Sequence, residues 1–332
     1  MNDRSVSYNI KPTLSVIIPC YNATDTIVNT LNSLERQKYK DFEAIVINDG
    51  STDNLDEIIR EYTRNSDITI NYIKQNNGGV SVARNTGLDN AKGQYIVFLD
   101  ADDVYHCNFI SSLYETLNKL NVDTVYCLFS RDIKKLSIEE DDGTVSCVER
   151  LSANEVMLNF MYKPMPMGFS TFIYKKSILE DNNIRFTPNV KYGEDLEFAW
   201  KYLPHCSTGA AIKKPLYGYY DNPKSAINTV NWGKTDLLAS IARVEDYLRE
   251  VNSPFYETYK DYMYARTIWA VSKTFAQAGK KEMFDRLNTE YHVKEYMKML
   301  NKAPDKRIAV SSWLYRINPG LFYWAVRKRQ SI

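Results

Sequence analysis

A buried strand that ends in three carboxylates constrains this sequence more than any other feature. Residues 94–103 read QYIVFLDADD. The apolar and β-branched first half of this stretch predicts a buried β-strand that starts just after Gly93. Asp100, Asp102 and Asp103 then follow within four residues. Carboxylates this close together repel one another and are costly at the edge of a core unless a cation or hydrogen-bond donors compensate them.

Two interpretations of these carboxylates stay open on the residues alone. One or two carboxylates that act together with substrate phosphates are a common binding site for Mg²⁺. Alternatively, acidic residues end the strand and open a loop, and Asp102 or Asp103 caps the next helix.

Strands and helices alternate through the chain before this stretch. The apolar runs predict strands at residues 14–19, 42–47 and 68–73, and helices follow at 27–34, 55–62 and 81–90, the first capped by Thr24 or Asp25. Such alternation predicts an α/β fold with a doubly wound, mostly parallel sheet. Ligands of these sheets bind outside the carboxyl ends of the strands. Four polar clusters lie at such ends: Tyr21-Asn22, Asn48-Asp49, residues 76–79 and residues 100–103.

The pattern loosens after Asp103. We expect helices at 109–120, 152–162 (with Ser152 and Glu155 as a capping box) and 194–203, strands at 124–129, 169–174 and 215–220, and a solvated turn at 139–143. From residue 232 to about 300 the sequence is helical, with breaks near Ser253-Pro254 and Gly279, and residues 301–306 resemble a linker. This predicts a catalytic domain over 1–220, with halves at about 12–104 and 105–220, and a helical region over 221–332.

Composition excludes several classes of protein. The net charge of +1 over 332 residues argues against a nucleic-acid binder held by its overall field. Five scattered cysteines without metal-ligand spacing indicate reduced thiols. The start has no apolar segment typical of a signal peptide, and no apolar run is long enough to span a bilayer. We therefore expect a cytoplasmic protein.

The last stretch, residues 307–332, combines five Lys or Arg with several aromatic residues and no acid. This composition suits a helix that lies on an anionic membrane surface, which would place the protein at the inner face of the cell membrane. The alternative is a tail that packs on its own domain or on a second subunit, and the C-terminal helices offer a surface for a homodimer.

Five segments together resemble the successive motifs of glycosyltransferase family 2. They are SVIIPCYN (15–22), VINDGSTD (46–53), NGGVSVARNTGL (77–88), YIVFLDADD (95–103) and GED (193–195). The resemblance covers about the first 220 residues. It implies a Rossmann-like GT-A fold and an inverting transferase that uses a nucleotide sugar.

The resemblance implies a donor pocket built from the first two motifs. Tyr21 would stack on the nucleotide base, with a buried core tyrosine as the alternative. Asp49 would accept a hydrogen bond from the uracil imide, with turn chemistry as the alternative. Pro19 and Asn22 flank Tyr21 in the same pocket, and Asp53 is expected there as a helix cap.

The third motif would bring backbone close to the donor. Gly78 and Gly79 have no side chain to prevent this approach. Arg84 lies on the following helix and would neutralise a phosphate or a carboxylate. Contact with the ligand and pairing with Asp100 or Asp102 both remain open for Arg84.

The DxD element, Asp100-Ala101-Asp102, is implied to bind the donor and a metal ion. Asp102 would ligate Mn²⁺ or Mg²⁺ directly, and Asp100 would reach the ribose directly or the metal through water. Asp103 would orient the other carboxylates. The ion would bridge the diphosphate and act as a Lewis acid for the leaving group.

The resemblance also makes Asp195 the general base, with Glu194 as the neighbour that could be mistaken for it. On the residues alone, two acids in the first turn of a helix also suit the helix dipole. His205 is the one candidate for a late histidine metal ligand, and structural roles are preferred for it and for His106 and His292. Ser170-Thr171 and residues 217–220 are expected to border the acceptor.

The leading hypothesis is a transferase that moves a hexose or N-acetylhexosamine from a UDP-sugar to a saccharide acceptor, lipid-linked, in bacterial capsule, exopolysaccharide or O-antigen synthesis. A sugar nucleotidyltransferase is one alternative, although PCYNATD lacks a glycine-rich phosphate loop. A nucleotide-sugar-binding protein without catalysis is the other. The sequence does not identify the donor sugar, the acceptor, the linkage or the oligomeric state.

Overall fold

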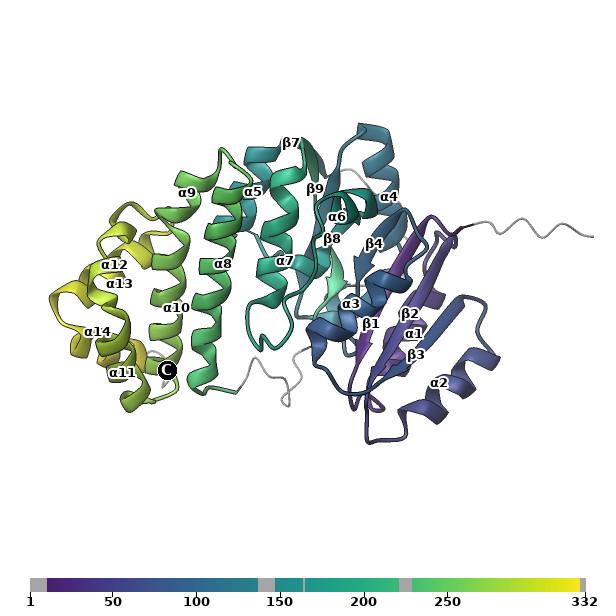
Figure 1. Ribbon diagram of the computed structural model, residues 1–332, viewed down its shortest axis with the longest axis horizontal. Coiled ribbons are helices and arrows are strands. Elements are labelled where there is room, and N and C mark those ends of the chain that lie inside the picture. The colour runs from purple at the N-terminus through teal and green to yellow at the C-terminus, as the bar shows by residue number, and fades with distance from the viewer. Residues whose placement is uncertain (1–10, 137–146, 164, 221–228, 329–332) are drawn as a thin grey trace, which may run out of the picture. The chain divides into compact units, whose positions relative to one another are not determined.

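The computed structural model describes residues 11–136, 147–163, 165–220 and 229–328 (Figure 1). The predicted turn at 139–143 lies outside these residues. Contacts divide the chain into two compact units. The first unit takes residues 1–152, 165–188 and 206–220, and the second takes 153–164, 189–205 and 221–332. That residues 1–220 form the catalytic domain stays a prediction.

The first unit contains a mixed β-sheet. Its described strands run in the order β3, β2, β1, β4, β8, β6, β9 and β5, with β7 paired to β9. Their bounds are β1 Leu14–Cys20, β2 Phe42–Asp49, β3 Thr69–Gln75, β4 Tyr95–Phe98, β5 Val104–Tyr105, β6 Thr124–Ser130, β7 Val148–Ser152, β8 Phe172–Lys175 and β9 Thr208–Gly218. The strands β3, β2, β1 and β4 are all parallel, and the antiparallel β8 joins them to the rest. This arrangement confirms the predicted α/β fold.

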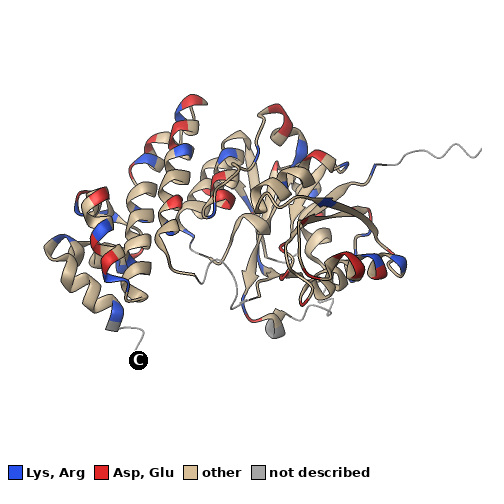
Figure 2. Ribbon diagram, turned by 60° about the horizontal axis from the view of Figure 1, so that its bottom comes forward, with Lys and Arg blue, Asp and Glu red and all other residues tan. Residues whose placement is uncertain are grey.

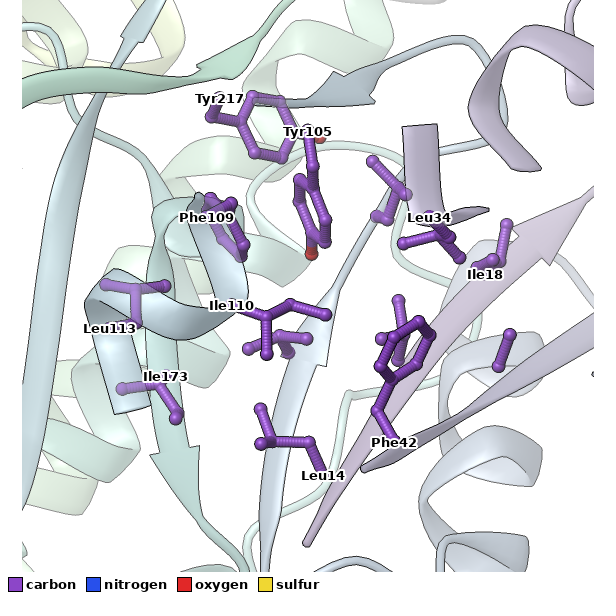
Figure 3. Close-up of a cluster of buried hydrophobic side chains, with 14 of the residues drawn as sticks. Leu14, Ile18, Leu34, Phe42, Tyr105, Phe109, Ile110, Leu113, Ile173 and Tyr217 are labelled. Carbon is purple, nitrogen blue, oxygen red and sulfur yellow. The ribbon is translucent and has the colours of Figure 1, made fainter. Parts of the chain in front are cut away.

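Helices cover both faces of the parallel strands (Figure 1). Residues of α1 (Ile27–Glu35), α2 (Leu55–Arg64) and α4 (Phe109–Leu120) share one buried cluster with Leu14 and Ile18 of β1 (Figure 3). In that cluster the rings of Tyr105 and Phe109 stack with centroids 3.7 Å apart. The helix α3 (Val80–Asn90) packs on the other face, where a Cβ at Gly87 would lie 2.4 Å from Cγ2 of Ile17. Burial on both faces explains the largely apolar sequences of β1, β2 and β4.

Two strand predictions need correction. The segment predicted as a strand at 169–174 begins with a 3-10 turn, η2 (Phe169–Thr171), and only then enters β8. The Thr171 amide and hydroxyl both donate to the Gly168 carbonyl, which closes this turn. The strand β9 starts at Thr208 instead of residue 215 and recruits β7, which the sequence did not predict. Lys213, Lys214 and Pro215 interrupt the apolar pattern of β9 and hide its first half.

The second unit is helical, as predicted for most of its sequence (Figure 1). Its helices are α5 (Ala153–Tyr162), α7 (Glu194–Tyr202), α8 (Asp236–Glu250), α9 (Tyr256–Lys260), α10 (Met263–Gln277), α11 (Lys281–Tyr291), α12 (Val293–Tyr296), α13 (Lys306–Ile317) and α14 (Pro319–Lys328). The remaining helix, α6 (Lys176–Asp181), belongs to the first unit. The predicted linker at 301–306 contains the end of a 3-10 turn, η6 (Met299–Lys302), and the start of α13. Among the described helices, none is both long and apolar enough to cross a bilayer.

Candidate functional site

The DxD element directly follows β4 in the first unit. Backbone pairing with β1 continues through the Leu99 amide, which donates to the Ile17 carbonyl at 3.0 Å. Asp100, Ala101 and Asp102 are then partly exposed, whereas Asp103 is buried. The two-residue strand β5 follows, and Asn108 is the N-cap residue of α4. The alternative in which Asp102 or Asp103 caps the next helix is therefore wrong.

Arg84 pairs with Asp100. Its Nη2 lies 2.9 Å from Oδ1 of Asp100, and only 4% of Arg84 is exposed. The guanidinium lies over the rings of Phe169 and Phe186, at 4.7 and 5.3 Å from their centroids. Asn85 fixes the backbone at Phe186 through two hydrogen bonds, from its Nδ2 to the carbonyl at 2.8 Å and from the amide to its Oδ1 at 2.9 Å. The structure shows the pairing of Arg84 with Asp100, and contact of Arg84 with the ligand stays a prediction.

Asp103 fixes the chain that follows the DxD element. Its Oδ2 accepts a hydrogen bond from the Tyr217 hydroxyl at 2.6 Å, and its Oδ1 accepts one from the Tyr220 amide at 2.8 Å. The Thr30 hydroxyl donates to the Asp103 carbonyl at 2.8 Å. Burial, together with the nearby charge of Asp100, raises the pKa of the Asp103 carboxyl to about 8. Tyr217 is 1% exposed, so its expected place beside the acceptor is wrong.

Asp49 holds the glycine pair of the third motif. Its Oδ1 accepts hydrogen bonds from Gln75 Nε2 at 2.7 Å and from the Gly78 amide at 2.9 Å, and its Oδ2 accepts one from the Gly79 amide at 2.8 Å. Gly79 has a φ of +84°, a conformation that side chains disfavour. Asn48, and not Asp49, accepts a hydrogen bond within the turn after β2. The Asp49 carboxylate thus shapes the loop after β3, a role that neither interpretation of this residue predicted.

The turn after β1 presents Tyr21 to solvent. Tyr21 is 54% exposed, so the alternative of a core tyrosine is wrong. Asn22, with a φ of +51°, locks this turn to the turn after β2: its amide donates to the Ser51 hydroxyl at 3.0 Å, and its Oδ1 accepts from the Thr52 amide at 2.8 Å. Pro19 lies partly buried just before the turn.

Asp53 reaches back to the loop after β1 instead of capping α2. Its Oδ2 accepts a hydrogen bond from the Thr24 amide at 3.1 Å. The N-cap residue of α2 is Asn54 and that of α1 is Thr26, so the predicted caps at Asp53 and at Thr24 or Asp25 are wrong. The Oδ1 atom of Asp53 is buried and has no hydrogen-bond partner among the described residues. A buried acceptor without a donor is costly, and a donor from a bound ligand would satisfy it.

Three carboxylates converge on the end of β1. Burial raises the pKa of the Cys20 thiol, and the charges of Asp100, Asp53 and Asp102 raise it further. The hydrogen bonds above also join the turns after β1 and β2 and the loop after β3. The four polar clusters predicted at strand ends therefore do meet at one edge of the sheet, as the rule for open α/β sheets predicts.

The residues at this edge fit a hard divalent cation. Asp100 and Asp102 supply carboxylate oxygens, and the side chain of Asp100 is 33% exposed. Within the described part of the chain, no group of three or more His, Cys, Asp and Glu residues could hold an ion unaided. A site of two carboxylates that is completed by substrate phosphates and water is typical of Mg²⁺ and related ions.

Glu194 and Asp195 belong to the second unit and form the first turn of α7. Asp195 is partly exposed, and its Oδ1 accepts a hydrogen bond from the next backbone amide at 2.7 Å. Two residues later in the same turn, Glu197 is buried and pairs with Lys201 Nζ and Arg243 Nη2, each at 2.7 Å. The pair with Arg243 anchors the start of α7 to α8, and the pair with Lys201 lies within α7. The assignment of Asp195 as the base, with Glu194 as its neighbour, stays a prediction.

The histidines contact protein groups. His205 Nε2 lies 2.7 Å from the Tyr247 hydroxyl in the second unit, and His106 Nδ1 accepts a hydrogen bond from the Asn108 amide at 3.1 Å. His292 ends α11 in a left-handed conformation. The contacts favour the structural roles that we preferred for His205 and His106, and the role of His292 stays a prediction.

Sequence reasoning missed the residues that support the site. Gln75 and Asn77 hold Asp49 by its side chain and its carbonyl, and the rings of Phe169 and Phe186 both lie against the Arg84 guanidinium. Gln75 could have been found, because it ends β3 as Asp49 ends β2 and the parallel register pairs the two. Nothing in the sequence points to the two phenylalanines, because they approach Arg84 from distant segments.

A Rossmann-like sheet with a DxD carboxylate pair at its carboxyl edge defines a GT-A glycosyltransferase. Residues 15–182, half of the chain, match the profile of Glycosyl transferase family 2, and the chain belongs to this family.

Two bacterial relatives illustrate the match. The uncharacterized glycosyltransferase EpsJ of Bacillus subtilis is 30% identical over 223 residues, which are 64% of this chain and 62% of EpsJ. The glycosyltransferase GlyA of Streptococcus pneumoniae is 41% identical over 219 residues, which are 62% of this chain and 30% of GlyA. The chain thus spans less than two thirds of either relative.

Solved structures share the fold. Staphylococcus aureus TarS 1–349, in complex with UDP-GlcNAc, aligns with a TM-score of 0.65 at 19% identity and covers 96% of this chain and 92% of its own. The mannosyltransferase PcManGT of Pyrobaculum calidifontis, in complex with GDP-Man and Mn²⁺, aligns with a TM-score of 0.55 at 16% identity and covers 94% and 88%. At these identities the likeness establishes the GT-A fold.

Proposed function

We propose that this glycosyltransferase moves a hexose or N-acetylhexosamine from a UDP-sugar to a saccharide acceptor, with inversion at the anomeric carbon. The observation that carries the proposal is the meeting of Tyr21, Asp53, Asp100 and Asp102 at the carboxyl edge of the parallel strands. The exposed ring suits the base of a nucleotide sugar, and the buried acceptor without a donor suits a sugar hydroxyl. The two partly exposed carboxylates suit a divalent ion that would also bind the diphosphate.

The donor base stacks on Tyr21, whose ring is exposed at the end of β1. Base stacking on an aromatic ring contributes about 1–3 kcal/mol. Asp49 Oδ2 accepts one hydrogen bond from the protein, which leaves a lone pair for the uracil imide. Pro19 and Asn22 shape the wall beside Tyr21, and Gly78 and Gly79 let backbone approach the donor. TarS, which has been solved with UDP-GlcNAc, supports a UDP-sugar as the donor.

Asp102 and Asp100 would hold Mn²⁺ or Mg²⁺, and Ala101 lies between them next to the ribose. When bound, the ion supplies Lewis-acid stabilisation to the departing diphosphate. Arg84 orients Asp100 through their ion pair and limits the repulsion among the three carboxylates of this segment. PcManGT, which has been solved with Mn²⁺, supports a divalent ion in this fold.

Asp195 takes the proton of the acceptor hydroxyl. As this oxygen forms a bond to the anomeric carbon, the bond from that carbon to the diphosphate oxygen breaks, and the electron pair leaves with UDP. One displacement from the opposite face inverts the configuration. A carboxylate is a weak base at neutral pH, so positioning must supply much of the rate enhancement.

The acceptor that we propose is a lipid-linked saccharide in the synthesis of a bacterial surface polymer, at the inner face of the cell membrane. Matches to the TarS poly(ribitol-phosphate) β-N-acetylglucosaminyltransferase of S. aureus and to the minor teichoic acid biosynthesis protein GgaB of B. subtilis support a polymer acceptor.

A donor screen with a pair of matched variants tests the proposal. The purified chain is incubated with Mn²⁺, a saccharide acceptor and each of several UDP-sugars, and the release of UDP is measured. Asp195→Asn should lose transfer but keep its affinity for UDP, and Glu194→Gln, the neighbouring control, should keep both. Consumption of pyrophosphate would instead indicate a nucleotidyltransferase, and binding without turnover would indicate a binding protein. Transfer retained by Asp195→Asn would contradict the assignment of the base.

A further inference from the structure

The C-terminal hairpin, α13 and α14, has buried and exposed large apolar side chains. Tyr315 and Phe322 are fully buried, and their rings lie 5.6 and 6.2 Å from the ring of Phe284 in α11. The Tyr315 hydroxyl donates to Asn288 Oδ1 at 2.8 Å. Figure 1 shows the hairpin beside α11. The hairpin is therefore a fixed part of the second unit, which agrees in part with the alternative of a tail that packs on its own domain.

Five other large apolar side chains of the hairpin are exposed. Each is at least half exposed: Val310 66%, Trp313 57%, Ile317 54%, Leu321 50% and Trp324 59%. In α13 the first three have the spacing i, i+3, i+7, which places them on one side of the helix. Leu321 and Trp324 repeat the i, i+3 spacing in α14. We define these five residues as the apolar face of the hairpin.

The charged residues of the hairpin are almost all basic. Residues 305–328 carry five Lys or Arg and a single acid, Asp305, and no acid follows it to the end of the chain. Arg307 pairs with Asp305 at 2.9 Å, whereas Lys306 and Arg327 are exposed at the two ends of the hairpin. In Figure 2 the helix that leads to the C-terminus carries basic but no acidic residues.

We propose that the apolar face of the hairpin docks on an anionic membrane surface. Tryptophan rings suit the boundary between headgroups and acyl chains, and Lys and Arg beside them attract anionic lipids. A second copy of the chain suits this face less well. A symmetric dimer would bring the basic residues of one hairpin against those of the other, and the hairpin has only Asp305 to compensate them. The docking does not depend on the proposed donor or acceptor.

Vesicle sedimentation tests the docking without any sugar transfer. The purified full chain is mixed with phosphatidylcholine vesicles, or with vesicles in which about a third of the lipid is phosphatidylglycerol, a mixture that binds basic segments. The chain should sediment with the anionic vesicles and bind at least about tenfold more weakly to the neutral ones.

Trp313→Ser with Trp324→Ser should lower binding to anionic vesicles by about tenfold or more, because the burial of two large apolar side chains is lost. Lys306→Gln with Arg327→Gln should lower it by about fivefold for each charge removed.

Val28→Ser with Val251→Ser is the matched control, because both valines are partly exposed and lie outside the hairpin. This variant should bind vesicles as the wild type does. The proposal is overturned if the wild type does not bind anionic vesicles, or if the double Trp variant binds them equally well. It is also overturned if size-exclusion chromatography shows a dimer that the double Trp variant dissociates while vesicle binding is absent.

Discussion

The hydrogen bond between Tyr217 and Asp103 should stabilise the edge of the site. A double-mutant cycle can measure the coupling energy between the two side chains. Both side chains are 1% exposed, and the hydroxyl lies 2.6 Å from Oδ2. Tyr217→Phe keeps the ring packed 5.7 Å from Tyr105 but leaves a buried oxygen without its donor, at a cost of about 1–3 kcal/mol. Asp103→Ala also removes the acceptor of the Tyr220 amide and should cost about 2–5 kcal/mol. The double variant should cost little more than Asp103→Ala alone, because both changes remove the same bond.

Unfolding in urea, followed by circular dichroism without divalent ions, gives these free energies. All five tryptophans lie in the second unit, so fluorescence reads that unit separately. Hydrogen exchange of peptides from β9 should accelerate in Tyr217→Phe, because the end of β9 loses its tie to Asp103. Asp103→Asn is the control: its amide can donate to the Tyr217 hydroxyl and accept from the Tyr220 amide, so it should cost less than Asp103→Ala. A coupling energy below about 0.5 kcal/mol would refute the reasoning.

Three further predictions concern charged groups. Arg84→Lys keeps the charge but loses the guanidinium that lies over the rings of Phe169 and Phe186. Calorimetry should therefore show roughly tenfold weaker binding of UDP with Mn²⁺, because Asp100 loses its orientation, and equal affinity would contradict the role of Arg84. Glu197→Gln leaves Arg243 without its buried partner and should lower the free energy of unfolding in urea by about 2–4 kcal/mol, as read by tryptophan fluorescence. A loss smaller than about 1 kcal/mol would contradict the role of this ion pair in joining α7 to α8. Burial lowers the pKa of His205 in the folded protein, so the unfolded chain binds a proton first as the pH falls through the ordinary histidine range near 6.5, and the folded state loses stability there. His205→Gln should therefore flatten the dependence of the melting temperature on pH between about 7 and 5. An unchanged slope would contradict this prediction.

The parallel half of the first unit could be predicted from the sequence because local patterns determine it. Apart from Ser15, Leu14 to Ile18 form an apolar run because both faces of β1 are covered. The convergence of Tyr21, Asp49 and Asp100 at one edge follows from the geometry of parallel strands. Each of these inferences needs only the order of elements along the chain.

The supporting contacts could not be predicted because they join distant segments. Tyr217 and Asp103 are 114 residues apart, and Glu197 and Arg243 are 46 apart. The short antiparallel additions β5 and β7 are too brief to show a period, and Lys213, Lys214 and Pro215 in the middle of β9 conceal its length. The predicted cap at Asp53 failed because tertiary contact with the loop after β1 competes with local capping.

The central claim is that the carboxyl edge of the parallel strands binds a nucleoside diphosphate together with a divalent ion. Isothermal titration of UDP, with and without Mn²⁺, tests it most directly in the wild type, in Asp102→Asn and in the surface control Asp285→Asn. We predict binding that needs Mn²⁺, that weakens by about 10–100-fold in Asp102→Asn and that is unchanged in Asp285→Asn. Equal affinity of Asp102→Asn and the wild type in the presence of Mn²⁺ would contradict the claim.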